Sequence, residues 1–361
     1  MSSIPSYMTT IYLNRSPEGE VKTDFGLPDS TFKVIKETVR ELKDGELLVK
    51  NLYLANDADQ RIYIRKDIST GAFEEDHVKE NHPMICHAVA KVLKSKDSKV
   101  KVGELIACTS HWGDYAIIPG KNVETGVIGA LGLPITSYVD TIGGTGLYAY
   151  FSIFNAFKLK KEHVLVVGGA AGATGSIIVQ LAKNVIGAKK VIGIAGGKSK
   201  CDFVKSLGAD ACIDYKDPNF AEKMKRALGR DGECDVYFDG IGGKILEEMF
   251  LLTKKNGTII AGGSVSGYND ADKAKINNWD LITSRSLHIR GFVLDDYIKG
   301  AVKAVLWISW WVKRGKINPK LIDLVDLTRD NQAIERIPAI WNRLFTGQKK
   351  GGKLITKLAD S

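Results

Sequence analysis

The chain has 361 residues, of which 44% are hydrophobic and 37 are glycine, and its formal net charge at pH 7 is +9. This size and apolar content predict two domains of ordinary size with real cores. They disfavour a membrane protein, because the longest apolar run, Val305–Val312, is far shorter than the ~20 residues that span a bilayer. The lysines are spread along the whole chain, so a basic enzyme with a polyanionic cofactor is preferred to a nucleic-acid-binding protein.

The cysteines and the first residues indicate the compartment. Five cysteines are scattered along the chain, and this odd number fits reduced thiols rather than a disulfide framework. Met1–Ser6 lacks a basic region followed by an apolar run, so no signal peptide is expected. The sequence therefore predicts a cytoplasmic protein.

The N-terminal part of the chain is predicted to be rich in strands. Gly45–Leu54 and Trp112–Ile118 have the pattern of strands in a β-rich unit. Gly351–Leu358, at the other end of the chain, looks like one more strand. Because no linker of proline or serine isolates this last strand, we expect it to rejoin the first unit.

The middle of the chain begins with a buried strand, a glycine turn and an amphipathic helix. Val164–Val167 is an apolar run, and it leads into Ala170-x-Gly172-x-x-Gly175, the dinucleotide fingerprint with alanine in the first glycine position. Glycine at 172 lets the backbone approach a diphosphate, and glycine at 175 lets the helix pack on its strand. The helix N-terminus then attracts phosphate. The residues expected to contact the dinucleotide are Ala170, Ala171, Gly172, Ala173, Thr174 and Gly175.

The next predicted strand indicates which dinucleotide binds. Lys190–Ala195 ends at Gly196, where an NAD enzyme usually carries an acidic residue that binds the ribose 2′-hydroxyl. No carboxylate appears before Asp202, and Lys198 and Lys200 stand where a 2′-phosphate would lie. This pattern favours NADP over NAD. The alternative is that the two lysines only cap and solubilise the following helix.

Strands and helices continue to alternate from there. The further strands are Ala211–Tyr215, Asp235–Asp239, Gly257–Gly262 and Leu287–Val293, and the helices between them are Lys200–Leu207, Phe220–Leu228 and Lys244–Leu252. Six strands with five crossovers make a complete doubly wound parallel sheet of the Rossmann type. The fifth crossover is mainly a polar loop, Gly267–Ile276, which is a candidate lid. Trp307, Trp310 and Trp311 share one face of a later helix, as expected for a core or a subunit contact.

Together these motifs resemble the medium-chain dehydrogenase/reductase superfamily, and within it the zinc-free prostaglandin reductase and alkenal double-bond reductase branch. The resemblance covers nearly the whole chain. It rests on Asp44–Arg61, Trp112–Tyr115, Ala170–Gly175, Tyr237–Gly243, Ser266–Asn269, Gly291–Val293, Leu344–Gly347 and Gly352–Lys353. It implies an α/β protein with a GroES-like catalytic domain over residues 1–142 and 326–361, a Rossmann NADP-binding domain over residues 143–325, and a homodimer.

The resemblance also implies NADPH as the cofactor and assigns roles to individual residues. Lys200 matches the lysine that contacts the 2′-phosphate, and Tyr215 matches the tyrosine beside it. Tyr268 matches a tyrosine near the nicotinamide ribose, which acts as a proton donor or an orienting group. The other positions implied to bind the cofactor are Gly196, Gly262, Phe292, Val293 and Leu294. The positions implied to border the substrate are Tyr53 and Tyr148.

Several positions depart from the family pattern. Gly240 stands where an asparagine usually contacts the cofactor, and Tyr148 replaces a threonine near the expected cleft. Lys349 or Lys350 stands near the place of another asparagine. Gly262 stands where many relatives carry cysteine, and Ala58 replaces a proline. These departures affect the expected substrate preference more than cofactor binding.

No metal site is expected from the sequence. Zinc-dependent members need a cysteine in the loop that here contains Asn56 and Asp57, and a Gly-His-Glu segment that this chain lacks. The densest candidate ligands are His77, Cys86, His82 and His87, and their spacing does not align them on one helix face. They are interpreted as hydrogen-bonded or solvated side chains.

Three functions are compatible with these features. The first is NADPH-dependent reduction of the C=C bond of an enal or enone, with Tyr268 near the developing enolate oxygen. The second is a quinone reductase, because quinones are also conjugated carbonyl compounds. The third is a protein without catalytic activity that binds NADPH and contacts RNA or another protein.

Overall fold

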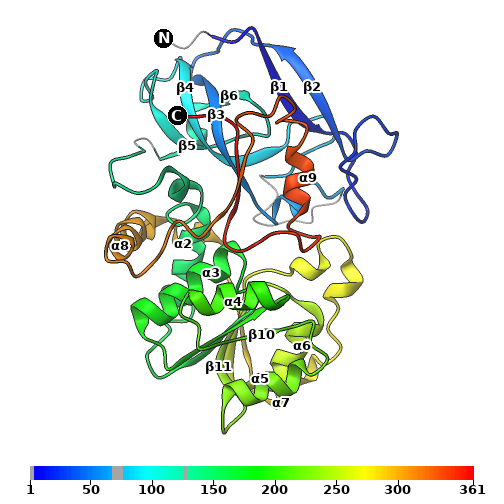
Figure 1. Cartoon of the computed structure of the whole chain (residues 1–361), viewed down its shortest axis with the longest axis vertical. Helices are drawn as coiled ribbons and strands as arrows, with labels where there is room; N and C mark the ends of the chain where they lie inside the picture. Colours follow the sequence, from blue (N-terminus) through cyan, green and yellow to red (C-terminus); the bar gives the residue numbers. More distant parts are fainter. Residues whose placement is uncertain (1–3, 67–75, 126–127) are drawn as a thin grey trace. The chain divides into compact units, whose positions relative to one another are not determined.

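The computed structural model describes residues 4–66, 76–125 and 128–361, and its chain folds into two compact units (Figure 1). Unit 1 contains Met1–Val139, Asp323–Lys349 and Leu354–Ser361. Unit 2 contains Asp140–Ile322 together with the short segment Lys350–Lys353. The chain therefore returns from unit 2 to unit 1 and contributes four more residues to unit 2 before its last strand.

Unit 1 is rich in antiparallel strands. Its main sheet has the order β14-β15-β3-β4-β5-β7, with β6 also paired to β3, and β1 and β2 form a separate pair. The strands are β1 (Tyr7–Leu13), β2 (Phe32–Thr38), β3 (Glu46–Asn56), β4 (Ile85–Ser95), β5 (Leu105–His111), β6 (Tyr115–Pro119), β7 (Val123–Thr125), β14 (Asp323–Asp326) and β15 (Leu354–Lys357), and the helices are α1 (Gln60–Tyr63) and α9 (Ile337–Asn342). The strand expected near the end of the chain is β15, which pairs antiparallel with β3.

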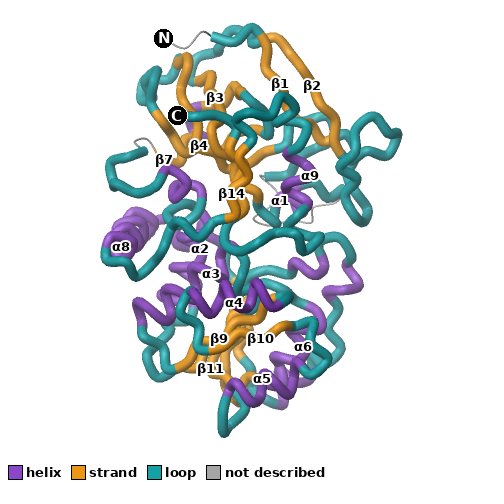
Figure 2. The backbone as a smooth tube through the Cα atoms, in the orientation of Figure 1, coloured by secondary structure: helices purple, strands orange, loops and turns teal. Residues whose placement is uncertain are grey.

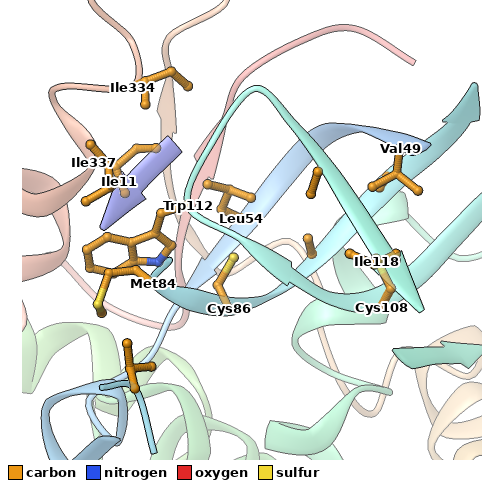
Figure 3. Packing of buried hydrophobic residues seen from close by; sticks show 14 of the residues in the cluster. Ile11, Val49, Leu54, Met84, Cys86, Cys108, Trp112, Ile118, Ile334 and Ile337 are labelled. Carbon is orange, nitrogen blue, oxygen red and sulfur yellow. The ribbon is translucent and has the colours of Figure 1, made fainter. Parts of the chain in front are cut away.

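The core of unit 1 joins residues from both ends of the chain. Trp112 and Trp341 are fully buried with ring centroids 5.4 Å apart, and the Phe32 ring lies 5.6 Å from that of Trp112. Figure 3 shows Trp112 in this cluster with Met84 and Ile337. The Trp341 indole N–H, which burial would otherwise leave unsatisfied, donates to the Asp57 carbonyl at 2.7 Å. The returning C-terminal segment is therefore part of the first unit's core.

Unit 2 is built on a parallel sheet of six strands in the order β10-β9-β8-β11-β12-β13. Figure 2 labels three of these strands, β9, β10 and β11, among the helices of this unit. The strands are β8 (Val164–Val167), β9 (Lys190–Ala195), β10 (Ala211–Asp214), β11 (Cys234–Asp239), β12 (Thr253–Ala261) and β13 (His288–Gly291). Numbered from β8, this order is 3-2-1-4-5-6, the order of a Rossmann fold. The fold is thus α/β, with a doubly wound parallel sheet and a separate β-rich unit, as the sequence predicts.

Helices cover the parallel sheet. They are α2 (Gly144–Phe151), α3 (Ala173–Gln180), α4 (Lys198–Ser206), α5 (Phe220–Leu228), α6 (Gly243–Leu252), α7 (Asp280–Ser284) and α8 (Ala301–Lys313). Apolar residues of α5 and α6 pack in one cluster with Val166 and Ile192 of the sheet. Right-handed crossovers place α3 and α4 on the other face, and α2 packs against α3 and α8. No helix in the described part of the chain is long and apolar enough to cross a membrane.

The predicted strands and helices of unit 2 are all present in the structure, and most of their bounds differ by one or two residues. Lys190–Ala195 and Phe220–Leu228 have the same bounds in both. However, β12 begins four residues before the predicted strand, and the fifth crossover contains α7. The three tryptophans of α8 differ in exposure, since Trp311 is buried while Trp307 and Trp310 are 43% and 45% exposed.

Candidate dinucleotide-binding site

The fingerprint turn lies at the carboxyl ends of the central strands of unit 2. β8 ends at Val167, and the chain passes through residues 168–172 into α3. Gly168 N donates to the Phe238 carbonyl at 2.8 Å, and Ala170 N donates to the Ile194 carbonyl at 3.0 Å. These bonds join the turn to β11 on one side and to β9 on the other. The turn therefore occupies the point where the strand order reverses, which is where α/β sheets bind ligands.

The turn also brings α3 close to the sheet. A Cβ atom on Gly175 would lie only 2.5 Å from the Gly169 carbonyl oxygen, so the helix approaches the turn more closely than a side chain allows. Gly172 is the N-cap of α3 and has an extended backbone. The first helical residues, Ala173 and Thr174, have N–H groups that the helix itself does not satisfy. This turn fits a diphosphate, because free N–H groups at the positive end of the helix lie beside a backbone that carries only glycine and small side chains.

A second group of predicted residues meets at the ends of β9 and β10. A Cβ atom on Gly196 would lie 2.7 Å from the Tyr215 ring, so this ring stacks directly over the glycine. Tyr215 is 44% exposed and has an accessible ring surface. Lys200 lies in the first turn of α4 and is half-buried, whereas Lys198 is exposed and forms an ion pair with Asp202. The geometry thus brings Gly196 and Tyr215 together, and Lys200 follows Gly196 by four residues, in the first turn of α4.

Sequence reasoning missed one carboxylate at this end of the site. Asp214 Oδ1 accepts hydrogen bonds from Gly197 N at 2.9 Å and from Lys216 N at 3.0 Å. It therefore ties the loop before α4, where Gly197 has φ +90°, to the end of β10 that carries Tyr215. The signal was available, since Asp214 is the last residue of the strand that neighbours β9.

The loop after β12 carries Tyr268 and is held against the start of α6. Ser266 Oγ donates to the Ile241 carbonyl at 2.7 Å. A Cβ atom on Gly243 would lie 2.0 Å from the Lys273 carbonyl oxygen, so this part of the loop packs directly on the glycine. The Tyr268 hydroxyl lies 3.4 Å from the place a Cβ atom on Gly263 would take. The loop predicted as a candidate lid is thus anchored at its base.

Aromatic rings from two other segments stack on each other, and Tyr148, one of the two, interacts electrostatically with Tyr268. The Tyr148 ring, on α2, stacks on the Phe292 ring after β13, with centroids 4.5 Å apart and an interplanar angle of 13°. Burial, together with the nearby Tyr268 phenol, raises the pKa of Tyr148 to about 12. Leu294 faces α2 through the same cluster, whereas Val293 is 36% exposed.

The predicted residues therefore form three groups within unit 2: the turn over residues 170–175, the pair of strand ends with Gly196, Lys200 and Tyr215, and the aromatic group around Tyr268. Tyr53 belongs to unit 1, where it is half-buried on β3 opposite Val89 and Lys357.

Comparisons with known proteins match both parts of the chain. Residues 9–125 match the family described as "N-terminal domain of oxidoreductase", and residues 173–307 match the family described as "Zinc-binding dehydrogenase". The chain is 30% identical to prostaglandin reductase 1 of Bos taurus over 332 residues, which cover 91% of this chain and 94% of that protein. The chain belongs to the medium-chain dehydrogenase/reductase superfamily.

Two further relatives of this medium-chain reductase are informative. The chain is 35% identical over 349 residues, 92% of each protein, to a Saccharomyces cerevisiae protein named "Uncharacterized membrane protein YML131W". The crystal structure of CurA from Vibrio vulnificus in complex with NADPH superimposes with a TM-score of 0.83 at 26% identity, covering 98% of this chain and all of that one. The protein is an oxidoreductase of this superfamily.

The side chains considered as metal ligands have other partners. His77 Nε2 lies 3.0 Å from the Arg65 carbonyl oxygen, and His87 Nδ1 lies 2.6 Å from Glu124 Oε1. Burial raises the pKa of the Cys86 thiol well above its usual value, which disfavours the thiolate that a metal requires. Within residues 4–66, 76–125 and 128–361, no three histidine, cysteine or acidic side chains form a group suited to a metal ion.

Two departures from the family pattern have different steric settings. A Cβ atom on Gly262 would lie 2.5 Å from the Phe238 ring, so this ring fills the volume that a side chain at position 262 would need. A Cβ atom on Gly240 would meet only ordinary contacts, the nearest at 3.5 Å. Glycine is therefore required at 262 beside Phe238, whereas position 240 has room for a side chain.

The segment Lys350–Lys353 is a part of unit 2 that the sequence did not predict. Gly352 N donates to the Ala171 carbonyl in the fingerprint turn at 3.1 Å. Lys353 is 2% exposed, and its Nζ donates to Thr145 Oγ1 at the start of α2 at 2.9 Å. This segment thus links the fingerprint turn to the helix that carries Tyr148. The closing Gly-Lys of the family pattern was the only signal for it.

Proposed function

We propose that this protein reduces the C=C bond of α,β-unsaturated aldehydes or ketones with NADPH. The observation that carries the proposal is the position of the Tyr268 hydroxyl at the carboxyl ends of β11 and β12, in the same unit as an intact dinucleotide turn. The similarity to prostaglandin reductase 1 supports the same activity, and the similarity to CurA, whose structure holds NADPH, supports the cofactor.

The residues that hold NADPH are assigned by their chemistry. The turn and the first residues of α3 bind the diphosphate, with Ala170–Gly175 as the contact segment. Lys200 binds the 2′-phosphate through its charge, and the Tyr215 ring and Gly196 receive the adenosine. Tyr268, Gly262 and the segment Phe292–Leu294 border the nicotinamide end. Unit 1 is the catalytic domain, and Tyr53 borders the substrate.

When bound, NADPH would supply the hydride that adds to the β-carbon of the substrate. The electron pair of the C=C bond then moves toward the carbonyl, and the negative charge develops on the carbonyl oxygen. The Tyr268 phenol donates a hydrogen bond to that oxygen, which lowers the barrier because the charge grows in the transition state. The α-carbon takes a proton from Tyr268 or from water, which completes the saturated product. The chain's donors perform this polarisation, so the reaction is zinc-independent.

Quinone reduction is the second candidate. The stacked Tyr148 and Phe292 rings present a flat aromatic surface, which suits a planar quinone as well as an enone. The two activities differ in product: a saturated carbonyl compound in one case, and a hydroquinone or semiquinone in the other.

We also propose a cytoplasmic homodimer. β13 is the edge strand of the parallel sheet, and all four of its residues are exposed. Later in the chain, α8 exposes Val302, Leu306, Trp307 and Trp310. An open strand edge and an exposed apolar helix face are each surfaces that a second copy of the chain could cover. Sedimentation of the wild type and of Trp310→Glu tests the dimer, since the variant is expected to be monomeric.

The cytoplasmic location is supported by the cysteines. All five are free thiols, which fits a reducing compartment.

The activity is tested by NADPH consumption with a panel of enals, enones and quinones, in the presence of a chelator and with products identified by mass spectrometry. A saturated aldehyde or ketone is the expected product. A hydroquinone would favour the second candidate. Tight NADPH binding with no turnover of any compound would contradict both, and would favour a binding protein whose partner is sought next.

A further inference from the structure

The start of α4 has no side-chain cap of its own. Gly197 is the N-cap residue of this helix, and a glycine has no side chain that accepts a hydrogen bond from the N–H groups there. Its φ of +90° is a conformation that residues with a side chain rarely adopt, which disfavours a capping serine or aspartate at this position. The loop between β9 and α4 is therefore held by a group from outside the helix.

Asp214, at the end of the neighbouring strand β10, provides that group. Its Oδ1 accepts hydrogen bonds from Gly197 N at 2.9 Å and from Lys216 N at 3.0 Å. The parallel pairing of β9 and β10 places Asp214 opposite Ala195, two residues before Gly197. One carboxylate oxygen thus joins the loop before α4 to the segment that follows β10.

The two segments that Asp214 joins carry the groups proposed to bind the 2′-phosphate and the adenosine. Lys200 lies three residues after Gly197, in the first turn of α4, and Tyr215 follows Asp214 directly. The Tyr215 ring also lies over the loop, because a Cβ atom on Gly196 would be 2.7 Å from that ring. Asp214 therefore fixes the main chain from which both side chains extend.

The hydrogen bonds and the charge of Asp214 have opposite effects on a bound phosphate. Both donors are main-chain N–H groups, and an amide oxygen in the same place also accepts from them. The hydrogen bonds order the loop before a ligand arrives, so less binding free energy is spent on ordering it. The negative charge, in contrast, opposes the binding of an anion at this end of the site. A change of Asp214 to asparagine separates the two effects.

We propose that Asp214 is a positioning residue for the 2′-phosphate, and that it sets the preference for NADPH over NADH by holding the loop before α4 against the end of β10. It acts through the Gly197 N–H rather than through a contact with the cofactor. The inference rests on the proposed function, because it takes Lys200 as the residue that binds the 2′-phosphate.

The test measures the binding of 2′,5′-ADP and of 5′-AMP to the full chain by isothermal titration calorimetry, since these two ligands differ only in the 2′-phosphate. Asp214→Ala removes the acceptor, and it is expected to lower the affinity ratio of 2′,5′-ADP to 5′-AMP roughly tenfold. Asp214→Asn keeps an acceptor oxygen and removes the repulsion, so the ratio is expected to stay at or above the wild-type value.

Two further variants separate positioning from stability. Asp214→Glu keeps the charge but moves the oxygen by one methylene, so it is expected to lower the ratio, and it decides the point if Asp214→Ala does not fold. Asp217→Ala is the matched control, because Asp217 Oδ1 accepts from Asn219 N at 2.8 Å and the carboxylate pairs with Lys223, not with the loop before α4. This control is expected to keep the wild-type ratio. Partial unfolding lowers both affinities equally, so it leaves the ratio unchanged.

The outcomes distinguish this inference from the proposed function. A wild-type ratio in Asp214→Ala, or a loss in Asp214→Asn as large as in Asp214→Ala, would overturn the inference. Equal affinity of the wild type for the two nucleotides would also overturn it, together with the assignment of Lys200. NADPH consumption decides the proposed function separately: a lowered ratio in Asp214→Ala, with no turnover of any enal or enone by the wild type, would support the inference and overturn the proposed function.

Discussion

The two ends of the cofactor site in unit 2 are built in different ways. The diphosphate end is one continuous segment, residues 168–175, and it is held by backbone hydrogen bonds and by the close approach of α3. The aromatic end is assembled from α2, the loop after β12 and the segment after β13, and it is held by side chains. The first end therefore tolerates almost no added atom, whereas the second accepts a new side chain such as Tyr148 without a change of fold.

The largest effect is expected from Gly175→Ala. The new Cβ atom would lie 2.5 Å from the Gly169 oxygen and 2.9 Å from the Ala170 Cα, and neither backbone atom yields easily. Overpacking of this kind costs about 1–3 kcal/mol, so we expect the melting temperature to fall by roughly 2–10 °C. The NADPH dissociation constant is expected to rise roughly tenfold. Calorimetry and fluorescence titration measure the two effects. Gly240→Ala, whose Cβ atom has room, is the control, and equal behaviour of the two variants would contradict the steric argument.

Lys200→Ala tests the specificity of the same end without disturbing its backbone. Loss of a charged hydrogen bond to the 2′-phosphate is expected to raise the KM for NADPH roughly 10- to 100-fold. The KM for NADH, which lacks this phosphate, is expected to change little. Lys198→Ala serves as the control, because its side chain is 90% exposed and pairs with Asp202. Equal changes with both cofactors would remove the assignment of Lys200.

Tyr268→Phe tests the aromatic end. Removal of one donor from the carbonyl oxygen is expected to lower kcat roughly tenfold while NADPH binding stays unchanged. Steady-state kinetics at saturating NADPH, together with a separate NADPH titration, measure the two quantities. Unchanged turnover would remove Tyr268 from the mechanism, and a parallel loss of NADPH affinity would indicate a role in cofactor binding.

The difference between the diphosphate end and the aromatic end also explains how much of the site the sequence predicted. The fingerprint turn and the strands around it follow from local rules, namely apolar runs, glycine spacing and helix periodicity, and β9 and α5 have the predicted bounds. Family resemblance located Tyr268 and Phe292, but their proximity to Tyr148 depends on how three distant segments pack. No periodicity encodes such an arrangement.

Two other features were missed for related reasons. Asp214 is an ordinary strand residue until the parallel pairing of β9 and β10 brings its carboxylate to the Gly197 N–H. The segment Lys350–Lys353 lies between stretches that belong to unit 1, and its hydrogen bonds from Gly352 to Ala171 and from Lys353 to Thr145 reveal its place in unit 2. Long-range pairings of this kind are set by tertiary packing rather than by local composition.

Gly240→Asn offers the finest test, because position 240 lies between the two ends of the site. The new Cβ atom would lie 3.5 Å from the Gly168 oxygen and 3.7 Å from the Phe238 ring, which are ordinary contacts, so we expect the fold to accept it. An amide here would add one hydrogen bond to the cofactor, and the NADPH dissociation constant is expected to fall by roughly two- to fivefold. Gly262→Cys is the matched comparison, since its side chain would meet the Phe238 ring at 2.5 Å and is expected to lower the melting temperature.

The steric argument would be contradicted if Gly240→Asn weakened NADPH binding while Gly262→Cys left the melting temperature unchanged. If both behave as expected, the chain has lost a cofactor contact at 240 that it still has room to regain, while Phe238 has made the glycine at 262 obligatory.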